Sequence, residues 1–271
     1  MSLWAEVRSF GCFGYFEREP REAARALIDA LMADLALERE LQISTAGRWR
    51  KFARKAVDDA IAKPSVELIA LLIGTSTDVR LGGHIDLHIR GSTEFRCPPM
   101  AWFGAESQRW PETMFVAAAR RWLQLAAEHA TPLSGGVLAA TDLRNAKVEM
   151  TQVFETYPDE NPDRSPTSFR GRLEKERPLH HTRTQIRRVY PITLLGPKFA
   201  SQIDVGALRD AGATNLTTVN GSVIFDAAPA LVEAWDPTYL AATPALRRLL
   251  WPLSMQHPMD DPDAKPTPSR R

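Results

Sequence analysis

Cysteine is scarce in this chain of 271 residues, which contains only Cys12 and Cys97. Each lies beside an aromatic residue or a proline, and a total of two is too low for the disulfide framework of a small secreted domain. The low cysteine content therefore favours a reducing compartment over an oxidising one.

Long apolar runs are also missing, because no stretch approaches the roughly 20 apolar residues that a membrane span needs. The first residues lack the positive and apolar tract of a secretory leader that ends in a small-residue cleavage site. We therefore expect the protein in the cytoplasm, without a membrane partner.

Charge of one sign is absent as a global feature, since 34 Lys and Arg residues oppose 33 Asp and Glu residues, a net charge of +1. This balance excludes a strongly acidic mimic of nucleic acid and a globally basic nucleic-acid binder. The apolar content of 44% is high enough for a folded core, so any partner must be recognised by a local patch.

Motifs of common enzymes are missing as well. The Ser134-Gly135-Gly136 step lacks the Gly-x-Ser-x-Gly pattern of a hydrolase elbow, and no glycine-rich run followed by Lys-Ser or Lys-Thr occurs. His180 and His181 are neighbours on one chain and point in different directions, which disfavours a catalytic pair. The sequence therefore supports neither a phosphate-binding loop nor a serine hydrolase.

Apolar periodicity predicts an α+β fold, with a single domain over 1–257 in which a mainly antiparallel sheet packs against amphipathic helices. The tail 258–271 is rich in proline and aspartate and is predicted to be disordered. Helices are predicted at 21–41, 47–62 and 111–129, and strands at 7–16, 66–73, 79–89, 137–140 and 148–154.

Two of these strands, 66–73 and 79–89, are expected to form an antiparallel pair. The segment 98–111 is predicted as a loop, because prolines and a glycine interrupt it. A charged, proline-containing stretch over 157–181 is predicted as a long surface excursion.

The C-terminal quarter carries the most distinctive pattern. An apolar run over 189–195 is rich in β-formers and stops at Gly196-Pro197, as a buried strand does. Asn220-Gly221 lies between two β-rich segments and predicts a hairpin with a type I′ turn. An amphipathic helix begins near Pro244 and closes at Trp251-Pro252.

This order of strand, Gly-Pro break, hairpin and Trp-Pro-ended helix resembles the C-terminal core of the type VI immunity family for VRR-Nuc toxins (TsiV). Less sharply, the resemblance extends over most of 7–253, including the strand end at Ile89-Arg90-Gly91 and the step at Ser134-Gly135-Gly136. The chain departs from the family in its long charged excursion and in the Ile-Phe-Asp-Ala-Ala-Pro sequence over 224–229.

The resemblance implies an immunity protein, or antitoxin, that binds and neutralises a nuclease effector of a type VI secretion system. The effector would be of the restriction-endonuclease-like class, and binding would block its active site or its access to DNA. The family has no catalytic residues to transfer to this chain, so the resemblance implies a protein that is not an enzyme and has no cofactor. The expected partner is therefore a protein toxin rather than nucleic acid.

Charged residues of the excursion are the candidates for partner binding. Four acidic residues form a cluster that suits a plug for the basic active-site cleft of a DNase: Glu155, Asp159, Glu160 and Asp163. The following segment 164–188 contains eight Lys or Arg residues and is an alternative nucleic-acid contact, although Phe169 is its single aromatic residue.

A metal-dependent enzyme is the second alternative. His84, Asp86 and His88 alternate along one predicted strand, and imidazole and carboxylate groups are ordinary ligands of zinc or iron. Successive side chains on one face of a regular strand are about 7 Å apart, too far for the outer pair to share a metal at about 2.1 Å. A solvated strand face is therefore the favoured interpretation.

Overall fold

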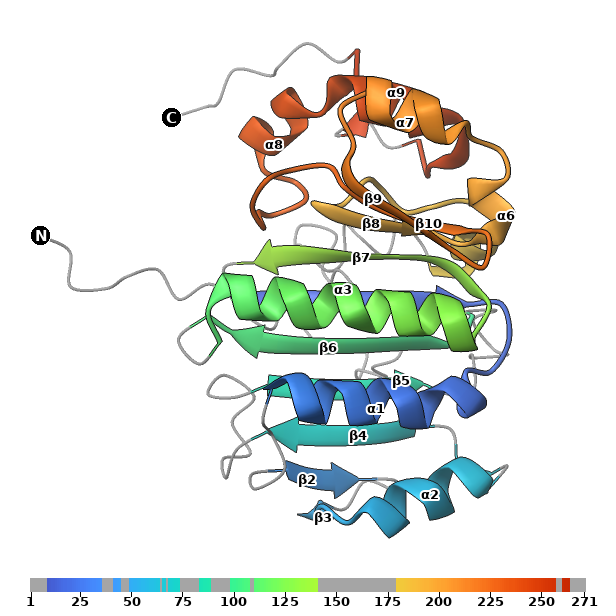
Figure 1. Cartoon of the computed structure of the whole chain (residues 1–271), viewed down its shortest axis with the longest axis vertical. Coiled ribbons are helices and arrows are strands. Elements are labelled where there is room, and N and C mark those ends of the chain that lie inside the picture. The colour runs from blue at the N-terminus through green and yellow to red at the C-terminus, as the bar shows by residue number, and fades with distance from the viewer. Residues whose placement is uncertain are drawn as a thin grey trace, which may run out of the picture.

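The structure of the chain is a computed structural model that describes residues 9–35, 41–44, 49–63, 65–66, 68–73, 83–88, 98–107, 110–140, 179–256 and 260–263. One sheet of ten strands dominates it, in the order β3-β2-β4-β5-β6-β1-β7-β8-β10-β9 (Figure 1). Every neighbouring pair in this sheet is antiparallel. The prediction of an α+β fold with a mainly antiparallel sheet is confirmed.

The first of the described strands, β1, lies in the middle of the sheet, between β6 and β7. All eight residues of this strand are buried, which agrees with its run of aromatic and small residues. The strands are β1 Ser9–Phe16, β2 Leu41–Ser44, β3 Arg50–Lys51, β4 Leu68–Ile73, β5 Gly83–His88, β6 Met100–Glu106, β7 Pro132–Ala140, β8 Ile192–Leu195, β9 Thr214–Val219 and β10 Ser222–Asp226.

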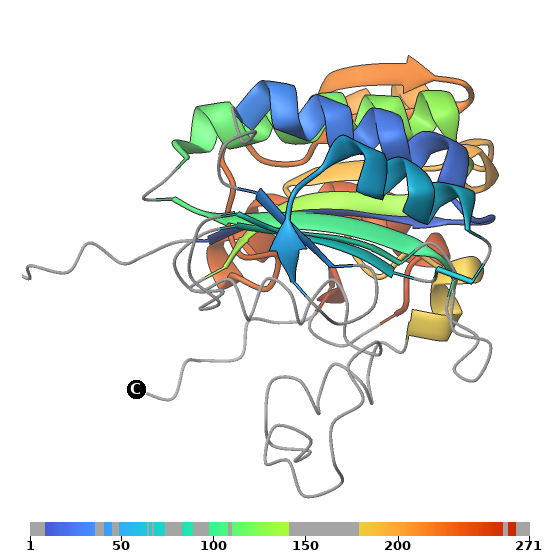
Figure 2. The ribbon, with the colours of Figure 1, turned by 90° about the horizontal axis from the view of Figure 1, so that it is seen from below.

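Three helices cover one face of the sheet: α1 Arg21–Leu35, α2 Arg54–Ala62 and α3 Glu112–His129 (Figure 2). The predicted apolar stripe of α3 is confirmed, since Phe115, Ala119, Trp122 and Ala126 are all fully buried. The Phe115 ring lies 5.3 Å from that of Phe10 on β1, between ring centroids, so helix and sheet share an aromatic core.

The C-terminal part of the chain packs on the opposite face of the sheet (Figure 2). It contributes the short helices α6 Pro197–Ala200, α7 Val205–Asp210, α8 Pro237–Ala242 and α9 Pro244–Leu250, and the 3₁₀ turns η3 Leu179–Arg183 and η4 Trp251–Leu253. On this face the ring of Tyr190 meets that of Phe13 edge-on at 4.9 Å and covers Gly136, where an added Cβ would lie 2.6 Å from the tyrosine Cγ. Glycine at 136 therefore makes room for the ring.

The predicted hairpin joins β9 to β10. Asn220 and Gly221 have φ angles of 46° and 77°, the left-handed values that both central residues of a type I′ turn require. Gly196-Pro197 also ends a buried strand as predicted, and Pro197 opens α6. Both local signals of the C-terminal quarter are thus confirmed.

Polar contacts fasten α3 to the C-terminal half at three points along its length. At its start, the Glu112 carboxylate accepts a hydrogen bond of 2.6 Å from the backbone N–H of Leu231. In its middle, Arg120 forms an ion pair with Asp226 of β10. At its end, the side-chain amide of Asn220 donates to the carbonyls of residues 127 and 128 at 3.3 and 3.2 Å. The β9–β10 hairpin is therefore held against α3.

Several predicted boundaries were wrong. The segment 98–111, predicted as a loop, contains β6, which pairs with both β5 and β1 and is held as a strand by these two ladders. The helix predicted over 47–62 begins only at Arg54, because the preceding residues pair as β3 with β2. Glycines 135 and 136 lie inside β7 rather than before it. The predicted strand 148–154 lies outside the described residues.

Candidate functional site

The acidic cluster predicted for partner binding, Glu155, Asp159, Glu160 and Asp163, lies outside the described residues. The same holds for most of the excursion and for the basic residues before 179. Their role in partner binding therefore stays a prediction.

The predicted metal ligands His84, Asp86 and His88 lie on β5, as expected from their alternation. The backbone register sets Asp86 opposite Trp102 of β6, but the three side chains lie outside what the structure describes. Within the described ranges, no group of three or more His, Cys, Asp or Glu residues is arranged to hold a metal ion.

The described end of the basic segment does not form a basic surface, which corrects the prediction for two of its arginines. Arg183 is exposed, but Arg187 and Arg188 retain only 1% and 3% of their accessible surface. The Arg187 guanidinium donates to the hydroxyl of Tyr15 at 3.4 Å, on the face of the sheet that the C-terminal helices cover. Because both arginines are enclosed, they cannot meet phosphates from solution.

These arginines belong instead to a buried polar cluster between the C-terminal helices and the sheet. Arg188 Nε lies 3.8 Å from a carboxylate oxygen of Asp260, and its guanidinium stacks 5.9 Å above the Trp235 ring. Arg247 of α9 donates to the carbonyl of Asp260 at 2.8 Å, and burial lowers its pKa. The hydroxyl of Tyr239 donates to the Val189 carbonyl at 3.1 Å.

Part of the tail 258–271, for which the sequence predicts disorder, lies beside this cluster. Residues 260–263 are described, and Asp260 is 5% exposed because it sits among the arginines of the cluster. Asp263 likewise accepts a hydrogen bond of 2.5 Å from Arg248 on the surface. The part of the tail after 263 lies outside the described residues.

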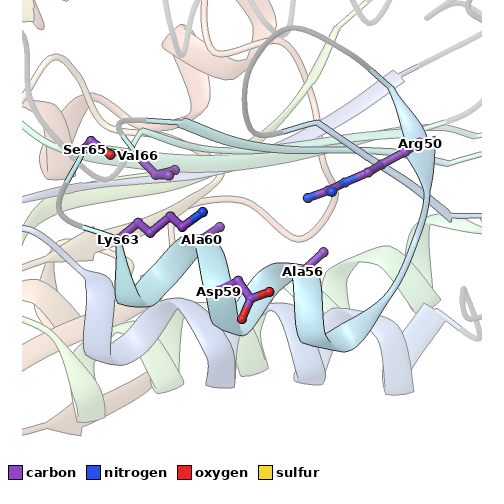
Figure 3. A pocket seen from close by; sticks show the side chains of 7 residues that line it. All are labelled: Arg50, Ala56, Asp59, Ala60, Lys63, Ser65 and Val66. Atoms are coloured by element: carbon purple, nitrogen blue, oxygen red, sulfur yellow. The ribbon is translucent and has the colours of Figure 1, made fainter.

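A pocket of about 370 Å³ lies at the other end of the sheet, between the edge strand β3 and helix α2 (Figure 3). Arg50 reaches toward it from β3, opposite Asp59 of α2 and Lys63, which follows the helix (Figure 3). Its remaining lining is small or apolar: Ala56, Ala60, Ser65 and Val66. The hydrogen bond from Lys55, at 2.8 Å, holds the pKa of Asp59 below its ordinary value, and Lys63 and Arg50 add to this effect.

The surface around this pocket is basic and contains an exposed tryptophan. Residues 49–63 contribute five Lys or Arg side chains against two Asp side chains. Trp49, next to the edge strand, keeps 39% of its surface accessible. Tryptophan and arginine are the residue types most often found as anchors in protein interfaces.

Sequence reasoning missed this surface because it placed Trp49 on a helix over 47–62. The available signal was the charged pair Arg50-Lys51 directly after Trp49, since lysine and arginine side chains are mostly exposed. We call the pocket with Trp49 and Arg50 the β3–α2 surface. Its chemistry suits contact with a carboxylate-bearing partner.

Comparison by sequence finds no matching family model and no match among curated proteins. Among solved structures, the fold is similar to that of the Pseudomonas aeruginosa T6SS protein PA0821, with a TM-score of 0.53 and 12% sequence identity. The similarity covers 92% of this chain and 73% of the other chain. In the described part of this chain, no helix has both the length and the apolar character needed to cross a bilayer.

Proposed function

We propose that this protein acts in the cytoplasm as an immunity protein of a type VI secretion system and neutralises a nuclease effector by binding it. The observation that carries this proposal is the fold, which matches a T6SS protein over 92% of this chain. The order of motifs over 189–253, which resembles the immunity family for VRR-Nuc toxins, supports the same assignment and points to an effector of the restriction-endonuclease-like class. The protein itself catalyses no reaction in this proposal.

Binding would be supplied by charged surfaces. The acidic cluster at 155–163 carries four carboxylates that complement the basic DNA-binding cleft of a nuclease, and such complementarity speeds association and sets specificity. The β3–α2 surface adds Trp49 and Arg50 as a second place of contact, with the opposite charge. Because the two surfaces carry opposite charge, each would meet an oppositely charged patch of the partner.

Burial of two arginines argues against the nucleic-acid alternative. Arg187 and Arg188 were two of the eight basic residues on which that alternative depended, and both hold the fold together instead. A nucleic-acid binder needs its cations on the surface, where they release counterions from phosphates. The immunity function does not require these two side chains to be exposed.

Co-expression tests the proposal directly. The genes adjacent to this one are searched for a nuclease effector, which is expressed in a laboratory bacterium, alone and together with this protein. We expect plating to return to the level of cells without the nuclease, and the two purified proteins to form a stable complex. Unchanged killing together with no complex would contradict the proposal.

A charge-reversal series then locates the contact. Glu155, Asp159, Glu160 and Asp163 are replaced together by lysine, and protection and affinity are expected to fall. The matched control reverses two exposed acidic residues elsewhere, Glu17 and Asp210, and keeps full protection. Equal protection by both variants would remove the acidic cluster from the interface while leaving the immunity function intact.

A further inference from the structure

The two edges of the sheet differ in the way they face solvent. At one edge, β3 has only two residues, Arg50 and Lys51, and both are charged and exposed. Short, charged edge strands are a common means of preventing a second sheet from pairing there. At the other edge, β9 runs over the six residues Thr214–Val219 and carries no charged side chain. Only the β3 edge is therefore protected by charge.

Exposure and composition both favour pairing at the β9 edge. Among the described strands, β10 is the one neighbour of β9, and three of its residues, Thr214, Asn215 and Thr218, are exposed. Threonine and valine, which make up four of its six residues, favour extended backbone. The Asn215 carbonyl of β9 accepts a hydrogen bond of 3.4 Å from Arg120. The rest of the strand, toward Val219, has no second described strand beside it and can present its backbone groups to one.

The turn geometry shows which backbone groups face outward. Val219 and Ser222 flank the two-residue type I′ turn and form the hydrogen-bonded pair that closes the hairpin. Pairs alternate along an antiparallel ladder, so Thr218 and Val223 form a pair without hydrogen bonds between them. The N–H and C=O of Thr218 consequently point away from β10, toward the open edge. A register shift near Asn215, whose φ is 48°, ends the regular ladder on the other side.

We infer that β9 is a self-association edge, at which two copies of this chain pair their β9 strands antiparallel about a two-fold axis close to Thr218. A two-fold interface brings each residue near the axis against its own copy, so any charge on the strand would face a like charge. The β9 strand has none, whereas β3 would set Arg50 and Lys51 against themselves. The net charge of +1 adds no long-range repulsion between copies.

The strength of this association follows from its size. One strand pair and the adjoining hairpin side chains bury less surface than the roughly 1,200 Å² of a stable interface. We therefore expect a weak, reversible dimer that forms as the protein concentration rises, and monomers in dilute solution.

Sedimentation velocity of the full chain over a wide concentration range tests the inference. The wild-type protein should shift reversibly from monomer to dimer. Thr218→Lys and Thr218→Asp each place like charges opposite one another and should weaken the dimer by more than about tenfold. An equal mixture of the two variants should restore association, because opposite charges then meet across the axis. Ala241→Lys, at an exposed position of α8, is the matched control and should dimerise as the wild type does.

A backbone variant provides a second measurement. Thr218→Pro removes an N–H that faces the open edge and leaves the ladder to β10 complete, so it should fold and stay monomeric. A wild-type chain that is monomeric at every concentration, or a dimer unaffected at Thr218, would overturn the inference. A β9 edge occupied only by a strand of the nuclease effector would also overturn it. The sedimentation outcomes for the chain alone do not depend on whether the protein is an immunity protein.

Discussion

Removal of one carboxylate, that of Asp226, should uncouple helix α3 from the C-terminal hairpin. Asp226 lies on β10 and accepts hydrogen bonds from Arg120 of α3 and, at 2.6 Å, from the side chain of Asn215 on β9. The Arg120 and Asp226 side chains are 19% and 11% exposed, so water screens their attraction only in part. The variant Asp226→Ala removes both contacts at once.

The size of the effect follows from the burial of this pair. Breaking a fully buried ion pair costs about 3–5 kcal/mol, and a hydrogen bond to a charged group contributes about 1.5–3 kcal/mol. Arg120 retains some access to water and Asn215 is exposed, so both partners recover part of their hydration in the variant. We therefore expect the free energy of unfolding to fall by about 2–3 kcal/mol.

Urea denaturation followed by tryptophan fluorescence measures this loss, with Asp58→Ala as the matched control. Asp58 pairs with Arg25 at 2.7 Å, but the two side chains are 38% and 54% exposed, and exposed pairs contribute at most about 1 kcal/mol. A double-mutant cycle with Arg120→Ala separates the pair energy from the individual losses. Equal losses of unfolding free energy in Asp226→Ala and Asp58→Ala would refute the argument that burial makes the Asp226 pair more stabilising.

Three further predictions concern stability. Gly136→Ala places a methyl group 2.6 Å from the tyrosine ring that covers this glycine, and should lower the free energy of unfolding by about 1–3 kcal/mol in thermal denaturation. Gly14→Ala, where the nearest side-chain atom is 3.4 Å away, should lower it less, and the reverse order would contradict this packing. Asp260→Ala leaves buried arginine charge without this carboxylate and should lower the free energy of unfolding by about 3 kcal/mol; a loss below that of an exposed pair would count against the buried cluster. Burial raises the pKa of the Cys12 thiol and the Tyr239 phenol above their ordinary values of 9.0 and 10.0. As the pH rises, both groups therefore ionise first in the unfolded chain, and the free energy of unfolding falls above about pH 9, by up to about 1.4 kcal/mol per pH unit for each group. Cys12→Ala with Tyr239→Phe should flatten this fall, and an unchanged pH profile would exclude these two groups as its cause.

Elements with a strong local signal could be predicted from the sequence. The apolar stripe of α3 follows a period of three to four residues, and Asn220-Gly221 requires a turn whatever surrounds it. Strand β6 was missed because its seven residues are all buried, which gives no alternation to detect, while prolines lie close to both of its ends. Its conformation depends on ladders to β1 and β5, which come from distant parts of the chain.

The candidate site was harder to predict, because burial of charge depends on partners far away in the sequence. Arg188 looked like part of a solvated basic loop, yet its carboxylate partner Asp260 lies in a segment whose composition predicted disorder. No local pattern connects the two. The β3–α2 surface was similarly hidden, because a strand of two residues next to a helix is too short for periodicity to separate from that helix.

The central place of β1 has a consequence for how the protein is made. Ser9, at the start of this strand, finally pairs with Glu106 and Ala140, so the second partner follows it by about 130 residues of synthesis. At 5–20 residues per second, the aromatic residues of β1 wait on the order of 10 s at the ribosome before β7 exists. A cell that makes this protein must keep its first strand from aggregating during that interval, and the amount of functional protein will depend on chaperones as well as on final stability.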